Sequence, residues 1–237
     1  MIDKERLAQK CSTWNIALSP AQLDLLDRYA ELLVDYNQKV NLTAITSPEG
    51  IEDRHFADSL LFAAQPEVSG KLVDVGTGAG FPGMVLKLMV PELRLTLVDS
   101  LGKRLDWLGE VCGALGLEGV ERRHARAEEL ALQSGWRDSF DFATARAVAE
   151  LRVLCEICLP YVKVGGRFLA MKAADCDEEL SAAAHGAELL GGRLLPSYRY
   201  HIPGTEVDRR VIVVEKVAPT PKGYPRRWAK IQKSPLS

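Results

Sequence analysis

The sequence predicts a Rossmann-like α/β fold, in which a parallel sheet ends in an antiparallel hairpin and carries an N-terminal helical extension. Apolar residues at helical spacing fill about the first 65 positions. Strand and helix patterns alternate from Lys71 onward, which is typical of a parallel sheet covered by helices on both faces. The last two strand-like runs, 194–202 and 209–217, are separated by too few residues for a crossover helix, so we expect them to pair antiparallel.

The helical extension is indicated by two helix starts. Ser19-Pro20-Ala21-Gln22 forms a capping box with proline at the first helical position, so a helix begins at Pro20. Ser47-Pro48 opens a second helix by the same signal, and its apolar residues continue to Ala63. Pro66 to Gly70 breaks the pattern, and we place a domain boundary there. The predicted division is a helical cap over 1–68, an α/β domain over 69–217 and a basic tail over 218–237.

The α/β domain is expected to contain five parallel strands before the hairpin. Their predicted ranges are 72–75, 93–98, 120–122, 140–145 and 167–171. The helices that connect and cover them are predicted over 83–89, 103–115, 150–161 and 175–190.

Composition excludes several classes of protein. The chain has 237 residues, of which 47% are apolar and 26% charged, with a net charge of -2, which are ordinary values for a globular protein. No apolar stretch approaches the roughly 18 residues that a membrane span needs. The five cysteines are sparsely spread and charged residues follow Met1, so we expect a cytoplasmic protein without a disulfide framework. We also expect a monomer.

The most informative segment is the glycine-rich stretch from Val73 to Gly83, where a strand runs into a loop and then a helix. Gly78-x-Gly80-x-x-Gly83 satisfies the dinucleotide fingerprint, and Asp99, at the end of the next strand, suits a pair of ribose hydroxyls. An NAD-dependent oxidoreductase is therefore one candidate function. A plain tight turn is the structural alternative for the loop.

Asp74 argues for a different cofactor. It precedes the loop, where a carboxylate would repel a pyrophosphate docked on the helix N-terminus but would attract an ammonium or a sulfonium. The terminal hairpin also departs from the six-stranded parallel dinucleotide fold. S-adenosylmethionine, which has one ribose, no phosphates and two cationic centres, fits both observations.

Six segments along nearly the whole chain carry a family resemblance. They are Asn41–Thr43, Arg54–Leu60, Asp74–Gly83, Asp99–Arg104, Arg146–Ala149 and Tyr224–Arg226. In these segments the chain resembles the RsmG or GidB family of bacterial small-subunit (16S) ribosomal RNA guanine-N7 methyltransferases, which have a class I S-adenosylmethionine-dependent methyltransferase sheet. Two departures stand out: Ala173 follows Lys172 where glycine is expected, and Trp228–Ile231 replaces a tail rich in proline and glycine.

The resemblance implies a cofactor site and a substrate. It implies a methyl transfer to N7 of guanine 527 in 16S ribosomal RNA, either free or in a small-subunit particle. It also implies that the adenine of the cofactor lies against Ala127 and Glu128, although a helix-capping or solvated acid is the alternative reading of Glu128. The resemblance also assigns Gly76, Gly78, Phe81 and Arg146 to the cofactor site. Asp74 and Asp99 are expected there from the argument given above.

Guanine N7 has a free lone pair and no proton, so its methylation requires placement and orientation but neither a general base nor a metal. No firm catalytic residue is therefore expected. The candidates for lining the RNA substrate are Arg54, His55, Lys103, Arg104 and Lys172. Solvated or capping side chains are the alternative reading of these positions. A cofactor-binding RNA assembly factor without turnover is the third candidate function.

Two further features have a structural alternative. The tail contains Lys222, Arg226, Arg227, Lys230 and Lys233 but no acid, so it can follow a phosphate backbone or remain solvated. Cys155-x-x-Cys158 lies in the middle of a predicted helix between leucines, which favours core packing over a redox or zinc site.

Overall fold

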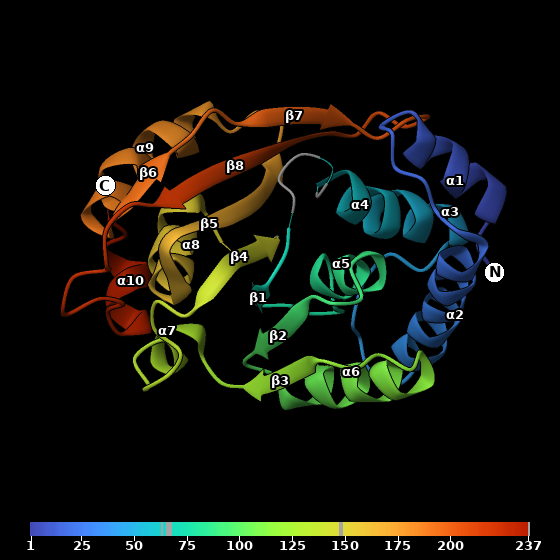
Figure 1. Cartoon of the computed structure of the whole chain (residues 1–237), viewed down its shortest axis with the longest axis horizontal. Coiled ribbons are helices and arrows are strands. Elements are labelled where there is room, and N and C mark those ends of the chain that lie inside the picture. Colours follow the sequence, from blue (N-terminus) through green and yellow to red (C-terminus); the bar gives the residue numbers. More distant parts are fainter. Residues whose placement is uncertain (63, 65–67, 147–148, 237) are drawn as a thin grey trace.

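A computed structural model of the chain describes residues 1–62, 64, 68–146 and 149–236. Its centre is one sheet in the order β3-β2-β1-β4-β5-β8-β6, with β7 also paired to β8 (Figure 1). Strands β1 to β5 are parallel and β8 is antiparallel to β5, which confirms the predicted class of fold. The strands are β1 (Lys71–Val75), β2 (Arg94–Asp99), β3 (Val120–His124), β4 (Phe140–Arg146), β5 (Val162–Ala173), β6 (Gly192–Leu194), β7 (Tyr198–His201) and β8 (Asp208–Lys216).

The terminal hairpin is present, but its first strand is divided. We predicted one strand over 194–202, whereas β6 and β7 pair with β8 separately. The N–H of Leu195 still donates to the carbonyl of Val213 at 2.9 Å. Pro196 follows and has no N–H to donate, so the ladder stops there and resumes at Tyr198.

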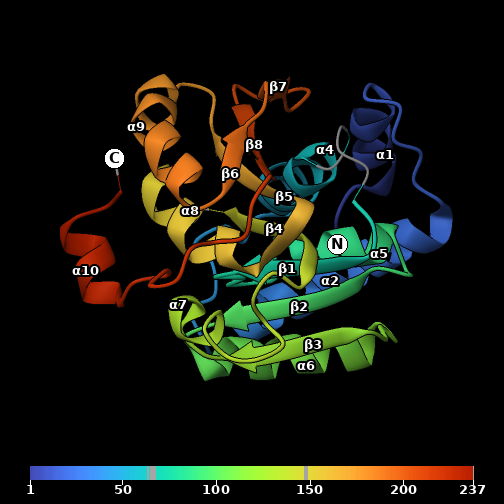
Figure 2. The ribbon, with the colours of Figure 1, turned by 60° about the vertical axis from the view of Figure 1, so that its left-hand side comes forward.

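Helices cover both faces of the sheet because residues along its central strands alternate between two apolar clusters. Leu72 joins one cluster and its neighbour Val73 joins the other, so β1 is buried on both sides. One set of helices lies to the right in Figure 1 and the other to the left, and Figure 2 shows the same two groups from another side. No described helix is long and apolar enough to cross a membrane. The first set comprises α1 (Lys4–Ser12), α2 (Pro20–Asn37), α5 (Gly83–Met89) and α6 (Gly102–Ala114); the second comprises α7 (Ala127–Leu130), α8 (Leu151–Cys158), the 3-10 helix η2 (Leu159–Tyr161), α9 (Asp177–Leu189) and α10 (Trp228–Lys233).

The N-terminal helices begin where the capping signals predicted. Ser19 and Gln22 form the capping box of α2, and the Ser47 side chain accepts the Gly50 N–H at 3.1 Å. We predicted one continuous helix from Pro48, but the structure divides it into three parts. They are α3 (Pro48–Ile51), the π-helix η1 (Glu52–Ala57) and α4 (Asp58–Phe62). Apolar spacing does not reveal a π-turn, because it contains no breaking residue. Ala63 and the first two residues of the predicted boundary at 66–70 lie outside the described residues, and the domain division stays a prediction.

The N-terminal helices are attached to the glycine loop through Tyr29 of α2. Its ring is fully buried and stacks on Phe81 with ring centroids 5.3 Å apart. Its hydroxyl donates to the carbonyl of Ala79 at 2.6 Å. The helical layer therefore holds the loop in place as well as covering the sheet.

The tail is folded onto the second helical layer rather than free. Arg226 donates from two nitrogens to the two carboxylate oxygens of Glu156, at 2.8 and 2.6 Å, and Glu156 is fully buried in α8. Bidentate pairing satisfies a carboxylate that would otherwise be costly to bury. Arg226 is thus unavailable as a phosphate ligand, whereas the side chains of Lys222, Arg227 and Lys230 are exposed, as is that of Lys233.

Candidate cofactor and substrate site

A cavity of about 480 Å³ opens at the carboxyl ends of β1, β2 and β4. Open parallel sheets bind ligands at this edge. The sheet side of the cavity is formed by the glycine loop and by the segments that follow β2 and β3, and the helical side by residues before and within η1. The lining residues that the sequence singled out are His55, Gly76, Gly78, Phe81, Asp99, Arg104, Ala127, Glu128 and Arg146.

The glycine loop needs glycine for two separate reasons. Gly78 has φ of +57°, and a Cβ there would meet no neighbour closer than 3.9 Å, so its requirement is conformational and the space beside it is open. Gly83 has an ordinary φ, but a Cβ there would lie 2.6 Å from Oδ2 of Asp74. The loop therefore packs closely on Asp74 at Gly83 and exposes its backbone to the cavity at Gly78.

Asp74 lies beneath this loop and does not line the cavity. Its Oδ2 accepts hydrogen bonds from the Thr77 hydroxyl at 2.8 Å and from the Gly83 N–H at 3.0 Å. Its Oδ1 is buried and has no hydrogen-bond partner among the described residues. Burial raises the pKa of the Asp74 carboxyl to about 6. The sequence-based view that Asp74 stands at the mouth of the loop was wrong; it is an under-compensated negative charge behind the loop.

Asp99, at the end of β2, faces the cavity while it holds the loop. Its carboxylate accepts the Gly78 N–H and the Leu101 N–H, each at 2.9 Å, and lies 3.3 Å from a guanidinium nitrogen of Arg104. A carboxylate has about four acceptor positions, so Oδ1 keeps one for a ligand and Oδ2 gains one if the half-exposed Arg104 moves. The geometry is compatible with ribose hydroxyls.

Ala127 and Glu128 begin α7 and form the far end of the cavity. Glu128 is only 4% exposed, which contradicts its reading as a solvated acid. One of its carboxylate oxygens accepts from Nε of Arg126 at 2.9 Å, and the Arg126 guanidinium lies over the ring of Trp228 at 5.2 Å. Trp228 of the tail also lines the cavity, so the tail completes this end of the site.

Phe81, His55 and Arg146 form the opposite end. The His55 and Phe81 rings stack with centroids 4.3 Å apart, and the Arg146 guanidinium lies 5.1 Å from the Phe81 centroid. Arg146 donates to the carbonyl of Arg54 at 2.9 Å and to Nδ1 of His55 at 3.2 Å, and lies 3.6 Å from Asp58. Burial, together with the adjacent Arg146 charge, lowers the pKa of His55 to about 3, so this imidazole is neutral.

The predicted substrate residues separate into two groups. His55 and Arg104 line the cavity. Arg54 and Lys103 have exposed side chains outside it, and Lys172 is bound to Glu179 at 2.6 Å and to the Ala149 carbonyl at 3.2 Å. Through its bond to the Ala149 carbonyl, Lys172 connects β5 to the segment before α8, and it does not line the cavity.

The sequence missed Thr43 and Trp228 as cavity residues. Thr43 lies in one of the segments that carry the family resemblance, yet neither its residue type nor its position indicated a role. Cys155 and Cys158 are fully buried free thiols in α8, and burial raises the pKa of both, which agrees with a packing role. The described residues hold no group of three or more His, Cys, Asp or Glu that could bind a metal.

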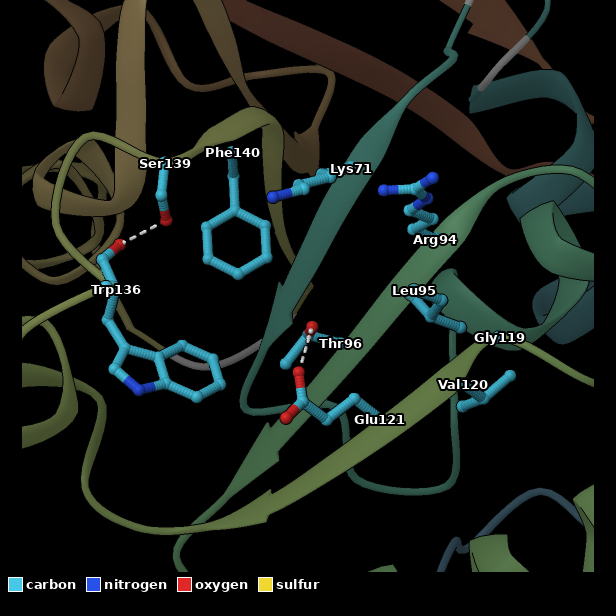
Figure 3. A pocket seen from close by; sticks show the side chains of 11 residues that line it. Lys71, Arg94, Leu95, Thr96, Gly119, Val120, Glu121, Trp136, Ser139 and Phe140 are labelled. Carbon is cyan, nitrogen blue, oxygen red and sulfur yellow. Dashed lines mark hydrogen bonds between the residues drawn. The ribbon is translucent and has the colours of Figure 1, made fainter.

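A second cavity, of about 580 Å³, lies at the amino ends of β1, β2 and β3 (Figure 3). Trp136 and Phe140 border one side of it, and Glu121 is bonded to Thr96 across its floor at 3.4 Å. It is larger than the first cavity but has neither the glycine loop nor the ends of the parallel strands. The cavity at the carboxyl edge is therefore the candidate site.

Comparison with known proteins yields a family match over most of the chain. The model of the GidB family, described as rRNA small subunit methyltransferase G, matches residues 22–201. The Ribosomal RNA small subunit methyltransferase G of Exiguobacterium sibiricum is 42% identical over 237 residues, which cover 99% of this chain and 100% of that protein. The protein of the same name from Halalkalibacterium halodurans is 45% identical over 231 residues, or 97% of each chain.

Solved structures show the fold. TrmN from Thermus thermophilus matches with a TM-score of 0.53 and 20% identity, over 70% of this chain and 53% of that one. The 16S rRNA (adenine(1408)-N(1))-methyltransferase from Catenulisporales acidiphilia, solved with cosubstrate SAM, matches with a TM-score of 0.52 and 16% identity, over 69% of this chain and 92% of that one. Identities this low support the predicted class I methyltransferase architecture alone.

Proposed function

The chain belongs to the rRNA small subunit methyltransferase G family, and from this premise we propose that it transfers a methyl group from S-adenosylmethionine to N7 of a guanine in small-subunit ribosomal RNA. The observation that carries the proposal is the single cavity in which the bare glycine loop, Asp99 and Arg146 meet at the carboxyl edge of the sheet. Membership of a methyltransferase family favours this function over the two alternatives that the sequence left open, an NAD-dependent oxidoreductase and a non-catalytic RNA assembly factor.

The cavity residues fit this cofactor. The open backbone at Gly78 admits a ligand, and Asp99 has acceptor capacity for ribose hydroxyls. Ala127 and Glu128 would hold the adenine, and Gly76, Phe81 and Arg146 the methionine end. The unpaired buried charge of Asp74 favours a cationic ligand over a pyrophosphate. When bound, S-adenosylmethionine supplies an electrophilic methyl group on its sulfonium.

The protein residues then act by placement. Guanine N7 attacks through its own lone pair, so no side chain has to remove a proton, and the neutral His55 is not required as a base. Rigid walls such as the stacked His55 and Phe81 rings confine the reacting atoms, and such confinement can supply several kcal/mol of the barrier reduction. The guanidinium of Arg146 shapes this end of the cavity through its contacts to the helical layer.

The test is transfer of labelled methyl groups to small-subunit ribosomal RNA, supplied both free and in particles, from a strain that lacks the modification. We expect label in this RNA and none in large-subunit RNA. Gly78→Ala should abolish S-adenosylmethionine binding because the added methyl fills open cavity space. Gly116→Ala is the matched control, since Gly116 has a similar φ of +64° and an equally open surrounding but does not line the cavity. Equal loss of binding in the two variants would contradict this location of the site.

A further inference from the structure

The hydroxyl of Thr43 is held in one place by the segment between α2 and α3. Asn37, at the end of α2, donates to the Thr43 carbonyl at 3.0 Å, and its side-chain oxygen accepts the N–H groups of Leu42 and Thr43 at 2.8 and 3.0 Å. Three hydrogen bonds from one side chain fix the backbone of Leu42 and Thr43. Thr43 also lines the cavity, and its hydroxyl lies 3.1 Å from Nε2 of His55, whose ring stacks on Phe81.

The hydrogen bonds of this hydroxyl have only one consistent arrangement. Arg146 can only donate, so Nδ1 of His55 must accept from it. Because His55 is neutral, its proton is on Nε2, which donates to Oγ1 of Thr43 at 3.1 Å. The N–H of Ile45 donates to the same oxygen at 3.0 Å.

Both acceptor positions of the Thr43 hydroxyl are therefore used, and its own proton remains to be donated. No acceptor for that proton is found among the described residues. Since Thr43 lines the cavity, the hydroxyl is a fixed hydrogen-bond donor that is available to a ligand there. Arg146, His55 and Thr43 form a chain that sets its direction.

We propose that Thr43 donates this hydrogen bond to O6 of the target guanine and so determines the choice of base, an inference that rests on the proposed function. N7 and O6 are adjacent acceptors on guanine, whereas adenine presents an amino donor in place of O6. N7 must keep its lone pair for the methyl group, so a donor that recognises guanine at this edge must use O6. The groups assigned to the cofactor come from the sheet and from the loops that follow its strands, whereas Thr43 comes from the segment between α2 and α3.

The proposal is tested with small-subunit RNA carrying guanine, inosine or 2-aminopurine at the target position. Inosine keeps N7 and O6, whereas 2-aminopurine keeps N7 but lacks O6. For the wild type, we expect kcat/KM to fall about 10- to 100-fold for 2-aminopurine and much less for inosine. Thr43→Val should lower kcat/KM for guanine by a similar factor but not lower that for 2-aminopurine further. Thr43→Ser, which keeps the hydroxyl, should restore the discrimination between the two bases.

Binding of S-adenosylmethionine, measured by calorimetry, separates the other outcomes. It should be the same in the wild type, Thr43→Val and Thr43→Ser. An equal loss for guanine and 2-aminopurine in Thr43→Val would reduce Thr43 to a structural role, and a loss of cofactor affinity would assign its hydroxyl to the cofactor; either result overturns the inference. A wild-type enzyme that binds S-adenosylmethionine but methylates none of the three RNAs would overturn the proposed function as well.

Discussion

The buried carboxyl of Asp74 predicts that cofactor affinity depends on pH. Its pKa is raised to about 6 by burial, so the free protein takes up a proton there below pH 6. A cationic cofactor across the glycine loop favours the ionised form. At pH 5 only about one molecule in ten carries the ionised carboxylate, so the apparent Kd for S-adenosylmethionine should be about tenfold weaker than at pH 7. This ratio corresponds to about 1.4 kcal/mol.

The same group affects stability with a defined sign. The folded pKa lies above the unfolded value of 3.8, so the folded state holds more protons between about pH 4 and 6 and the free protein loses stability as pH rises through this interval. The loss should amount to about 3 kcal/mol for a shift of roughly two pH units. Asp74→Asn keeps the shape of the side chain and should remove both dependences.

The assay is calorimetric titration with S-adenosylmethionine at pH 5, 6 and 7 in buffers of different ionisation enthalpy. Binding below pH 6 should release up to one proton, and the release should disappear in Asp74→Asn. A flat affinity across this range, or an equal slope in wild type and Asp74→Asn, would refute the reasoning.

Other residues give four further predictions. Asp99→Ala should weaken cofactor binding about 10- to 100-fold by calorimetry, with RNA affinity in a filter-binding assay nearly unchanged; unaltered cofactor affinity would contradict the ribose assignment. Arg146→Ala should lose activity mainly through cofactor affinity, because Arg146 orders the wall beside Phe81; intact binding with collapsed turnover would instead place it on the base. Arg226→Met should lower the free energy of unfolding by about 3 to 5 kcal/mol, since it leaves the buried Glu156 unpaired, and an unchanged denaturant midpoint would contradict this. Lys230→Gln, on the exposed side of the tail, should leave stability unchanged and reduce the salt slope of RNA binding by about 0.7; a full slope would exclude Lys230 from RNA contact.

Local signals in the sequence predicted much of the fold because those elements depend on local chemistry. The capping box at Ser19, the N-cap at Ser47, the strand-to-glycine transition at Val75 and the short hairpin connection each act within a few residues. The π-turn at η1 left no such signal, and it carries His55. The division of the last strand was readable in principle from Pro196, which cannot donate to the ladder.

The candidate site could be predicted only in part from the sequence, because its contacts join segments that are far apart in the chain. Asp99 was identified from its spacing to Gly78, and the structure places the two in direct contact. The directed hydroxyl of Thr43 depends on Arg146, which lies 91 residues beyond the histidine that connects them. The pairing of Arg226 with Glu156, 70 residues apart, converts a basic tail residue into a structural one. Composition and local residue spacing do not predict contacts between residues so far apart in the sequence.

The central claim, methylation at guanine N7, is tested most directly by mapping the product. A purified enzyme, S-adenosylmethionine and unmodified small-subunit RNA are incubated, and the RNA is then reduced and cleaved with aniline, which breaks the chain at N7-methylguanosine. We predict one enzyme-dependent cleavage at a single guanine, at position 527 by the family resemblance, and no cleavage with Gly78→Ala. Methyl groups that enter the RNA without producing such a cleavage would contradict the account.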